Sequence, residues 1–596
     1  MPAAPVLTAP DIEIPPQLAP LTLQQPDGVW FEAMPGRTTL TYAEQERIAA
    51  WVFDSLFPAP GSSRASLPVE NAAPAMLFLS LSDGSSKADV LRASGLTIQS
   101  AVEALVSQVD VYLLSNAKPL WAKLDLVDEV IAYDGYDLSS AVMDDASLFG
   151  LAFQGSSRIA LLPEVLAAET IFDRDQKFQL SNLADYLEEQ SLPVDILTSL
   201  DPPDIVPVFR FSTDSFFYQD GAVIPLYRGH RVVSSPSPGD LLSSAVGGGN
   251  YLTNAVREDG RFVYSYQPAT DKESDAYNIL RHTGTVYAMA DLYQLTGDPR
   301  LLAALDRALD YLRRQIQKCQ INGIFENCIV EQGETKLGGN GLAVLAFSQY
   351  MQATGTRDLL DETRSLARWI VATQSASGQF MIHKVHLASG ETTDFVSDYY
   401  PGEAIYGLAR LYQLDKNDQW LSAASKGARW LAADRIQGKA QNEIEHDHWL
   451  LLGLDELQHI NPDPAYMDAA IRIADAIIVS QNLEPEFADW FGGFYKPPRS
   501  TPNATRAEGL LAAYRVTRDY GTKAQSERIL RAARNSIAFQ LGTQFQPESA
   551  MYFSDPQRIL GGFHQSLTDF EIRNDYVQHN ISSILALYRS LSDNLG

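Results

Sequence analysis

The stretch ARWIVATQSASGQF, residues 367–380, ends an amphipathic helix and turns the chain within a few residues. Apolar residues recur at helical spacing up to Gln374, with Arg368 on the charged side. Gly378 then breaks the helix and Phe380 follows it. The same order of helix, glycine and aromatic residue recurs in the C-terminal part of the chain, about every 50 to 70 residues, which is typical of an internally repeated structure.

The glycine and aromatic residues recur regularly enough to divide this part of the chain into repeated units. A glycine and an aromatic residue follow five of the six amphipathic helices, at Gly260 and Phe262, Gly323 and Phe325, Gly378 and Phe380, Gly493 and Phe494, and Gly562 and Phe563. The exception is the linker QGKAQNEIEHDHW, residues 437–449.

Helical spacing predicts twelve helices after residue 238, at 239–255, 278–296, 299–318, 340–354, 357–376, 400–414, 417–435, 446–459, 464–481, 504–520, 523–541 and 578–592. Every second helix, such as HWLLLGLDEL at residues 448–457, is apolar on nearly every side, as a fully buried helix must be. The others carry one charged face. We therefore expect six hairpins of an outer and an inner helix, closed into a toroid with short glycine-aromatic turns.

Known families share this layout. Gln374, Gly378 and Phe380 resemble the glutamine-tryptophan repeat of squalene and terpene cyclases. The whole region is similar to the (α/α)6 toroids of six-hairpin glycosidases, N-acylglucosamine 2-epimerases and the C-terminal domain of glucuronyl C5-epimerases. The resemblance implies the toroid and leaves the chemistry open, because one architecture serves unrelated reactions.

The chain of 596 residues is too long for one core and predicts a multidomain α+β protein. Residues 1–28 are proline-rich and read as a disordered tail. Mixed strand and helix patterns over residues 29–205 predict an α+β domain, residues 206–238 an extended connector, and residues 239–596 the catalytic toroid.

The charge and hydrophobicity of the chain limit the kinds of partner it can bind. Lys plus Arg is 46 against 74 for Asp plus Glu, a formal charge of −28, which disfavours nucleic acid. The sequence has no apolar run long enough for a membrane span and no signal-peptide pattern at its start, so we expect a cytoplasmic protein. Cys319 and Cys328 flank eight residues and are expected to be reduced. No cofactor or metal is expected, and a homo-oligomer is left open.

In such a toroid all inner helices run parallel, so their N-termini and the turns before them meet at one end. Their combined dipoles favour electron-rich ligands there. The residues at these entrances suit a small-molecule or oligosaccharide substrate. The catalytic candidates are Glu403, Glu508, His448, Glu445, His282, Tyr400 and Asp575. The candidates for substrate binding are Arg281, Asn340, Trp449, Arg506, Arg573, His579 and Tyr277.

Each candidate also has a structural interpretation. Asp398, Asn503 and Asp575 are typical helix caps, His282 and His579 could be core histidines, and Arg281 and Arg573 could pair with nearby acids. His446 and His448 are two residues apart and do not share a helical face, so a zinc pair is a weak interpretation. We expect one of these histidines, with Glu445, to face the centre of the ring.

These residues favour a carbohydrate-active enzyme using general acid/base catalysis. Hydrolysis would need two opposed carboxylates, whereas epimerisation of a sugar or uronate would need two bases on opposite faces of one carbon. The alternatives are a non-catalytic module that binds a glycan or peptide, and a terpene-cyclase-like enzyme. The cyclase is disfavoured because the chain has no DxDD motif, and lanthionine-cyclase or prenyltransferase chemistry because neither cysteine lies at an inner-helix entrance.

Overall fold

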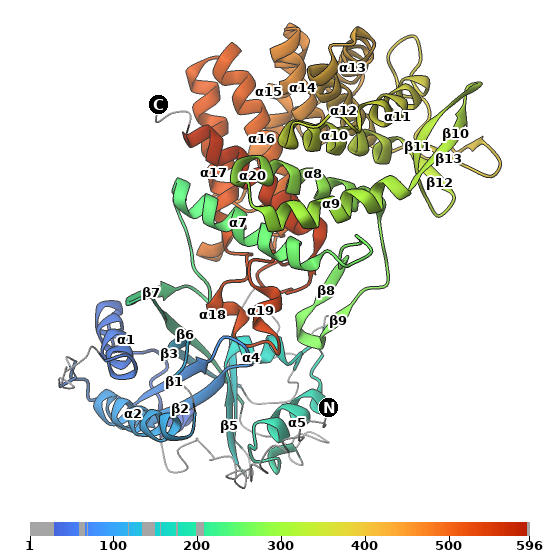
Figure 1. The fold of residues 1–596 in the computed structure, drawn as a ribbon. Coiled ribbons are helices and arrows are strands. Elements are labelled where there is room, and N and C mark those ends of the chain that lie inside the picture. Colours follow the sequence, from blue (N-terminus) through green and yellow to red (C-terminus); the bar gives the residue numbers. More distant parts are fainter. Residues whose placement is uncertain are drawn as a thin grey trace, which may run out of the picture.

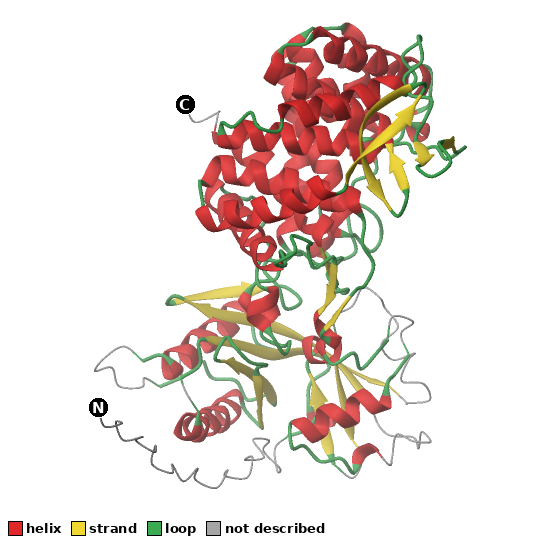
Figure 2. Cartoon of the chain, turned by 45° about the vertical axis from the view of Figure 1, so that its right-hand side comes forward, coloured by secondary structure: helices red, strands yellow, loops and turns green. Residues whose placement is uncertain are grey.

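The computed structural model describes residues 29–58, 66–67, 69–116, 118–133, 149–154, 157–173, 177–197 and 208–592. A β-rich N-terminal domain lies below a helical C-terminal domain (Figure 1), and Figure 2 shows the two parts by secondary structure. This confirms the predicted multidomain α+β class. The expected tail, residues 1–28, lies outside the described residues.

One sheet organises the N-terminal domain, in the strand order β2-β1-β3-β6-β4-β5, with β7 paired to β6 and every pair antiparallel. Its strands are β1 (Ala75–Ser82), β2 (Asp89–Gly95), β3 (Trp121–Tyr133), β4 (Gly150–Gln154), β5 (Arg158–Leu161), β6 (Val208–Gln219) and β7 (Ala222–Leu226). Its helices are η1 (Phe31–Ala33), α1 (Tyr42–Leu56), α2 (Ile98–Ser115), α4 (Pro163–Ala168) and α5 (Leu180–Glu189).

Both faces of this sheet are covered. Leu77 and Leu79 of β1 pack under α1 and α2, whereas Met76 and Phe78 join the core that continues into the helical domain. The hairpin expected as a connector after residue 205 supplies β6 and β7, so it belongs to the sheet.

A buried charge cluster joins the two domains. The ammonium group of Lys123 is fully buried and contacts Asp125 at 2.8 Å and Glu164 at 2.9 Å. It lies 5.6 Å from the ring of Tyr552, whose hydroxyl is 2.9 Å from that of Ser80. Because Tyr552 follows the last outer helix, the toroid contributes to the site that neutralises a cation of the sheet.

The C-terminal domain is a closed double ring of helices. The inner helices are α8 (Ile279–Thr296), α10 (Leu337–Thr354), α12 (Tyr400–Asp415), α14 (His448–Ile460), α16 (Ser500–Tyr520) and α20 (Asn574–Ser592). The outer helices are α7 (Pro238–Ala255), α9 (Pro299–Arg314), α11 (Leu360–Ala372), α13 (Asp418–Leu431), α15 (Pro464–Val479) and α17 (Lys523–Leu541). Each inner helix packs on the next, and α20 packs on α8. The predicted six-hairpin toroid is confirmed.

Short elements fill the connections before the inner helices. They are β8 (Ser265–Gln267), η2 (Pro268–Thr270), β9 (Lys272–Glu273), β10 (Ile316–Ile321), β11 (Ile324–Glu331), β12 (Glu334–Lys336), β13 (Lys384–His386), β14 (Glu391–Thr392), η3 (Ala432–Ile436), η4 (Gln441–Glu443), η5 (Ala488–Trp490), α18 (Pro547–Ala550), α19 (Pro556–Ile559) and β15 (Ile572–Arg573). No helix among the described residues is long and apolar enough to cross a membrane.

A glutamine at the end of three outer helices holds the ring together. The side-chain amide of Gln374 donates to the carbonyl of Gly378 in its own turn and to that of Ala423 in the next outer helix. Gln481 makes the equivalent pair of bonds to Gly492 and Ala532, and Gln544 makes it to Gly561 and Ser244. The last of these joins α17 to α7 and so closes the outer layer.

The glycine of these turns is needed for two reasons. Gly378 has φ +102°, and a Cβ there would overlap the carbonyl oxygen of Lys426 on the next outer helix. Gly260, Gly492 and Gly561 also have positive φ and meet a backbone carbonyl in the same way. In the last two turns the constrained glycine therefore precedes the Gly493 and Gly562 that the pattern singled out.

The second hairpin departs from the prediction. Gly323 and Phe325 lie at the tip of the β10–β11 hairpin, where nothing approaches Gly323 and Phe325 is exposed. Cys319 and Cys328 are joined as a disulfide across the same hairpin, in place of the reduced thiols we expected. The outer helix ends at Arg314 because the chain turns directly into β10.

Gly378→Ala should destabilise the protein more than Gly355→Ala. Both glycines have positive φ, but Gly355 has open space around its Cα, so alanine there carries only the backbone cost. The overlap with Lys426 should add about 2 kcal/mol at Gly378. Thermal unfolding of the two variants checks this, and equal melting temperatures would contradict the role assigned to the turn.

Candidate functional site

Three side chains from different inner helices meet inside the ring. His448 is the first residue of α14, Glu508 lies in α16 and His579 in α20. His579 Nδ1 is 3.0 Å and His448 Nε2 is 3.7 Å from the same oxygen, Oε2 of Glu508. The two imidazole rings lie 5.3 Å apart at 77° to one another. The structure thus places one carboxylate between two histidines, at residues that the sequence predicted for the site.

His448 is held in place without using its ring nitrogens. The preceding residue, Asp447, caps the helix by accepting a hydrogen bond from the backbone N–H of Leu450 at 2.9 Å. The His448 ring is buried against Trp449, with ring centres 4.8 Å apart. Among the described residues neither ring nitrogen has a hydrogen-bond partner. Burial, and then the neighbouring His579 and Arg506, lower the pKa of His448 well below its usual value, so the ring is neutral.

Glu508 and His579 form a dyad. We assign the bond between them to the Nδ1–H of His579 donating to the carboxylate, which leaves Nε2 as a proton acceptor. Burial raises the pKa of Glu508, and the contact with His579 acts in the opposite direction. The amide nitrogen of Gln578 also lies 3.1 Å from His579 Nδ1.

Two arginines share one acid close to this dyad. Asp575 precedes His579 by four residues in α20 and therefore lies on the same face, one turn nearer the helix start. Its oxygens accept hydrogen bonds from Arg573 at 2.5 and 3.0 Å, and Arg281 Nε lies 3.1 Å away. Arg281 also donates to the hydroxyl of Tyr264. The group carries a net positive charge next to the entrance.

A further buried carboxyl lies nearby in α12. Glu403 is buried, and a Cβ on Gly338 would overlap its Oε2, so the carboxyl sits against that glycine. Its Oε2 has no hydrogen-bond partner among the described residues. Burial, reinforced by Asp447, raises the pKa of Glu403 to about 8. Tyr400, in the same turn, packs between His383 and Phe395.

Other predicted residues have different surroundings. His282 Nε2 donates to the carbonyl of Ala308 at 2.9 Å, and its Nδ1 accepts from the hydroxyl of Tyr277 at 2.6 Å. Both ring nitrogens are therefore used in packing against the outer layer. Asn340 bonds to Ile329, Thr335 and Lys336 of the β11–β12 region. The hydrogen bonds of His282, Tyr277 and Asn340 thus give these three residues a structural role.

The segment EIEHDH is divided between three environments. Glu445 is exposed, His446 accepts a hydrogen bond from Arg506 Nε at 3.0 Å, and only His448 faces the cluster. Glu445, which we expected to face inward beside a histidine, is exposed and forms no hydrogen bond or ion pair with the cluster among the described residues. His446 and His448 do not converge, because side chains two residues apart at the start of a helix point in different directions.

Three residues of this region are not among the predicted site residues. Asp447 lies in the polar run before α14, and burial raises its pKa to about 7. Tyr399 lies 6.1 Å, ring to ring, from His448, and Tyr495 bonds to Arg506. Tyr399 adjoins Tyr400 at a predicted entrance, which is a signal in the sequence, whereas Tyr495 lies in a loop with no such signal.

The cluster could also hold a metal ion. One ligand atom from each of His448, Glu508 and His579 lies within 4.8 Å of the others. Two histidines and a carboxylate are a ligand set used by several divalent metals. The bond between Glu508 and His579 occupies Oε2 and Nδ1, so an ion bound through those two atoms would have to replace it.

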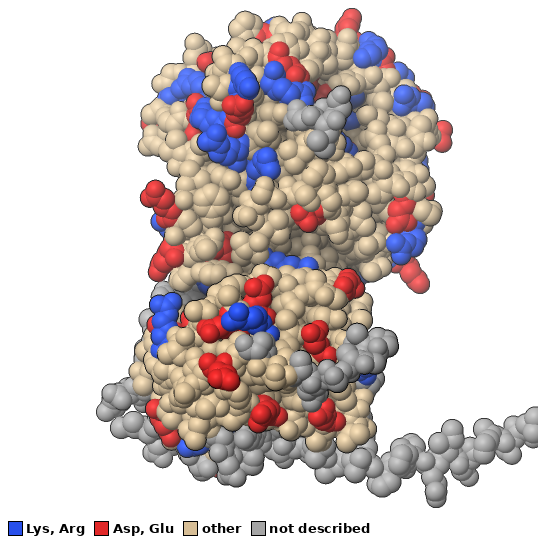
Figure 3. Space-filling model, turned by 90° about the vertical axis from the view of Figure 1, so that its left-hand side faces the viewer, with Lys and Arg blue, Asp and Glu red and all other residues tan. Residues whose placement is uncertain are grey.

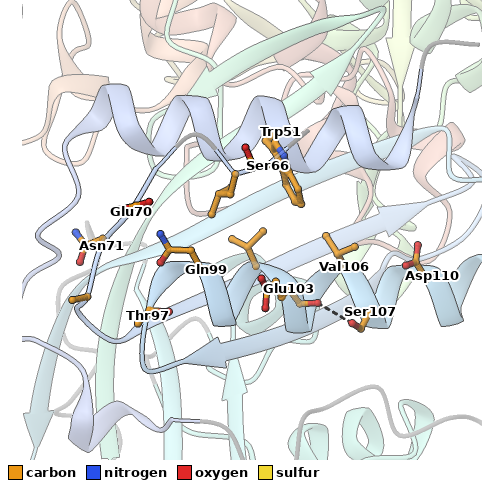
Figure 4. A pocket seen from close by; sticks show the side chains of 13 residues that line it. Trp51, Ser66, Glu70, Asn71, Thr97, Gln99, Glu103, Val106, Ser107 and Asp110 are labelled. Carbon is orange, nitrogen blue, oxygen red and sulfur yellow. Dashed lines mark hydrogen bonds between the residues drawn. The ribbon is translucent and has the colours of Figure 1, made fainter. Parts of the chain in front are cut away.

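A separate groove lies in the N-terminal domain. It has a volume of about 980 Å³ and lies between α1 and α2, with Trp51 of α1 and Val106 of α2 lining it (Figure 4). Glu70, Glu103 and Asp110 also line it. Its carboxylates have no histidine beside them among the described lining residues, so the groove lacks the proton-transfer arrangement of the ring.

Charged side chains outside the cluster lie on the surface and near the C-terminal ends of the inner helices. On the face turned left in Figure 1, Lys and Arg side chains gather on part of the helical domain, and acidic side chains spread over both domains (Figure 3). Arg410, Arg515 and Arg589 near the C-terminal ends of inner helices are paired with Glu456, Asp455 and Asp291. Cations suit those helix ends, where the dipoles are negative.

Comparison with known proteins gives structural neighbours only. No family model matches the chain, and no curated protein matches its sequence. A D-mannose isomerase is 12% identical with a TM-score of 0.46, covering 60% of this chain and 100% of that chain. A cellobiose 2-epimerase from Bacillus thermoamylovorans is 12% identical with a TM-score of 0.47, covering 59% and 99%. An unsaturated glucuronyl hydrolase specific for heparin is 15% identical with a TM-score of 0.41, covering 59% and 98%. Likenesses at this level assign no reaction to the chain.

Replacing Glu403 with glutamine should change how stability depends on pH. The folded protein binds a proton at Glu403 up to about pH 8, whereas an unfolded glutamate releases it near 4.5. Wild-type stability therefore falls between these values as pH rises, by up to about 5 kcal/mol, and this loss is absent in Glu403→Gln. Unfolding measured at pH 5 and pH 8.5 checks the sign. A constant difference between the two proteins would contradict a buried, protonated Glu403.

Proposed function

We propose that the chain is a carbohydrate-active enzyme that epimerises or isomerises a sugar by proton transfer. The observation that carries the proposal is the pair of buried histidines on either side of Glu508, one of them with both ring nitrogens unpaired. Two bases are what inversion at a carbon next to a carbonyl requires, because the proton leaves one face and returns to the other.

The residues divide the work as follows. Neutral His448 takes the proton from the carbon beside the sugar carbonyl, and the electron pair moves onto the carbonyl oxygen. The resulting enolate is stabilised by the guanidinium of Arg281, which Asp575 and Tyr264 orient. His579, held by Glu508 through Nδ1, takes up a proton from solvent on Nε2 and returns it to the opposite face. The enolate's negative charge stabilises the imidazolium of His448.

Glu508 acts through His579. A carboxylate bonded to Nδ1 fixes the tautomer and stabilises the imidazolium, as in other carboxylate–histidine pairs. Trp449 lies beside both histidines, with ring centres 4.8 and 6.0 Å away, and offers an aromatic face for the sugar. We infer no metal in this mechanism.

One observation favours a second candidate function, glycoside hydrolysis. Glu403 is a buried acid that keeps its proton at neutral pH and has a free oxygen, which are properties of a general acid. Its partner would have to be another carboxylate such as Glu508 or Asp575. Both of these are already bonded to basic side chains, and this favours the proton-transfer function.

Incubation in D₂O with reducing mono- and disaccharides, uronates included, tests the proposal. We expect deuterium to enter the carbon next to the carbonyl without cleavage. His448→Asn, His579→Asn and Glu508→Gln should each lower the rate by about 10²- to 10⁴-fold with little change in melting temperature. His459→Asn, at the other end of α14, should keep the wild-type rate.

Two results would contradict this mechanism. Release of a shorter saccharide without deuterium exchange would select hydrolysis. Loss of exchange after EDTA treatment, restored by a divalent metal, would show that the same three residues act as metal ligands.

A further inference from the structure

Arg506 has an unusual environment for a cation of this protein. Its Nε donates to His446 at 3.0 Å, its Nη1 to the carbonyl of Pro502 at 3.0 Å and its Nη2 to the hydroxyl of Tyr495 at 3.0 Å. The acceptors are a carbonyl, a hydroxyl and a neutral imidazole, because the His446 Nδ1 that accepts from Arg506 carries no proton. The guanidinium is thereby fixed in position while its charge stays uncompensated.

No carboxylate among the described residues forms an ion pair with Arg506. Most other arginines of the ring have such a partner, as Arg410 has in Glu456 and Arg515 has in Asp455. In a chain with 74 acidic and 46 basic residues, the partly buried Arg506 keeps a positive charge that a bound anion can balance. Three of the five guanidinium N–H groups are used, which leaves two to donate to an anion.

The surroundings of Arg506 fit a ligand site. Arg499 lies over the same Tyr495 ring, at 5.0 Å, as Arg506 does, which adds a second positive charge. Tyr495 is 48% exposed and has φ +73°, a conformation that is strained for a bulky residue and is held by a bond from Asn482 to its carbonyl.

This place also adjoins the proton-transfer cluster. Arg506 precedes Glu508 by two residues in α16, and its partner His446 precedes His448 by two residues. Tyr399 lies 6.1 Å from the His448 ring. Glu445 and Asp447 lie in the same segment as His446, but neither forms an ion pair with Arg506. A group bound at Arg506 would therefore belong to the same ligand as a carbon at His448.

We infer that Arg506 binds an anionic substituent of the substrate, which makes the substrate a sugar acid or a sugar phosphate. The inference rests on the proposed function for the position of the reacting carbon. Carboxylate and phosphate share the oxygen pair that two parallel N–H groups recognise. Arg506 is thus a specificity-determining residue.

Direct binding tests the inference apart from turnover. Calorimetric titration of the full chain with D-glucuronate, D-glucose 6-phosphate and D-glucose gives the preference for the anion and distinguishes its two sources. We expect one anionic sugar to bind about tenfold to hundredfold more tightly than glucose, and the difference to shrink at high salt.

Variants of Arg506 test whether this residue causes the preference for an anionic sugar. Arg506→Gln should abolish the preference, Arg506→Lys should keep part of it, and Arg307→Gln, at an exposed arginine of α9, should leave it unchanged. Equal binding of glucose and both anions by the wild type, or a preference that survives in Arg506→Gln at an unchanged melting temperature, would overturn the inference.

The two proposals fail in different ways. An Arg506-dependent preference without deuterium exchange would refute the proton-transfer function and leave the anion site standing. Exchange on neutral sugars at a KM that Arg506→Gln does not change would do the reverse.

Discussion

The close approach of backbones at the outer turns determines the architecture of the helical domain. Glycine at positive φ brings one outer helix against a carbonyl of the next, and a glutamine amide bonds to both. The same device joins the last outer helix to the first through Gln544 and Ser244. With the outer layer fixed in this way, the inner helices have to run parallel, and their starts have to meet.

That meeting explains the electrostatics of the site. Buried titratable groups are costly unless they pair or become neutral. Glu508 pairs with His579, and Asp575 pairs with two arginines. Burial keeps Glu403 protonated and His448 uncharged. The ring thus keeps a neutral base, a paired base and a protonated acid close to one another, which is a suitable arrangement for moving protons.

Sequence periodicity was sufficient for the fold of the helical domain, because alternation of buried and amphipathic helices needs no long-range information. It also gave the helix starts and hence a set of candidates that contained His448, Glu508 and His579. It could not separate them from His282, which occupies a similar position in its helix but is rotated toward the outer layer and bonded there. The rotation of a helix about its axis depends on packing with both neighbours.

The features that the sequence did not predict also depend on contacts between residues distant in the chain. Gly323 and Phe325 match the repeat in sequence, but a disulfide-joined hairpin replaces the turn. The role of Arg506 depends on which acids lie near it in space, and a count of charges does not reveal that. Glu445 adjoins the site in sequence and still points to solvent, because Asp447 sets where the helix begins.

Glu508 and His579 form a bonded pair beside an unpaired, neutral His448. Nitrogen-15 NMR of histidine-labelled protein measures this directly. We predict that His579 carries its proton on Nδ1 and that its signals shift in Glu508→Gln, with His448 remaining uncharged at pH 6. Histidine spectra that Glu508→Gln leaves unchanged, or a charged His448 at that pH, would contradict it.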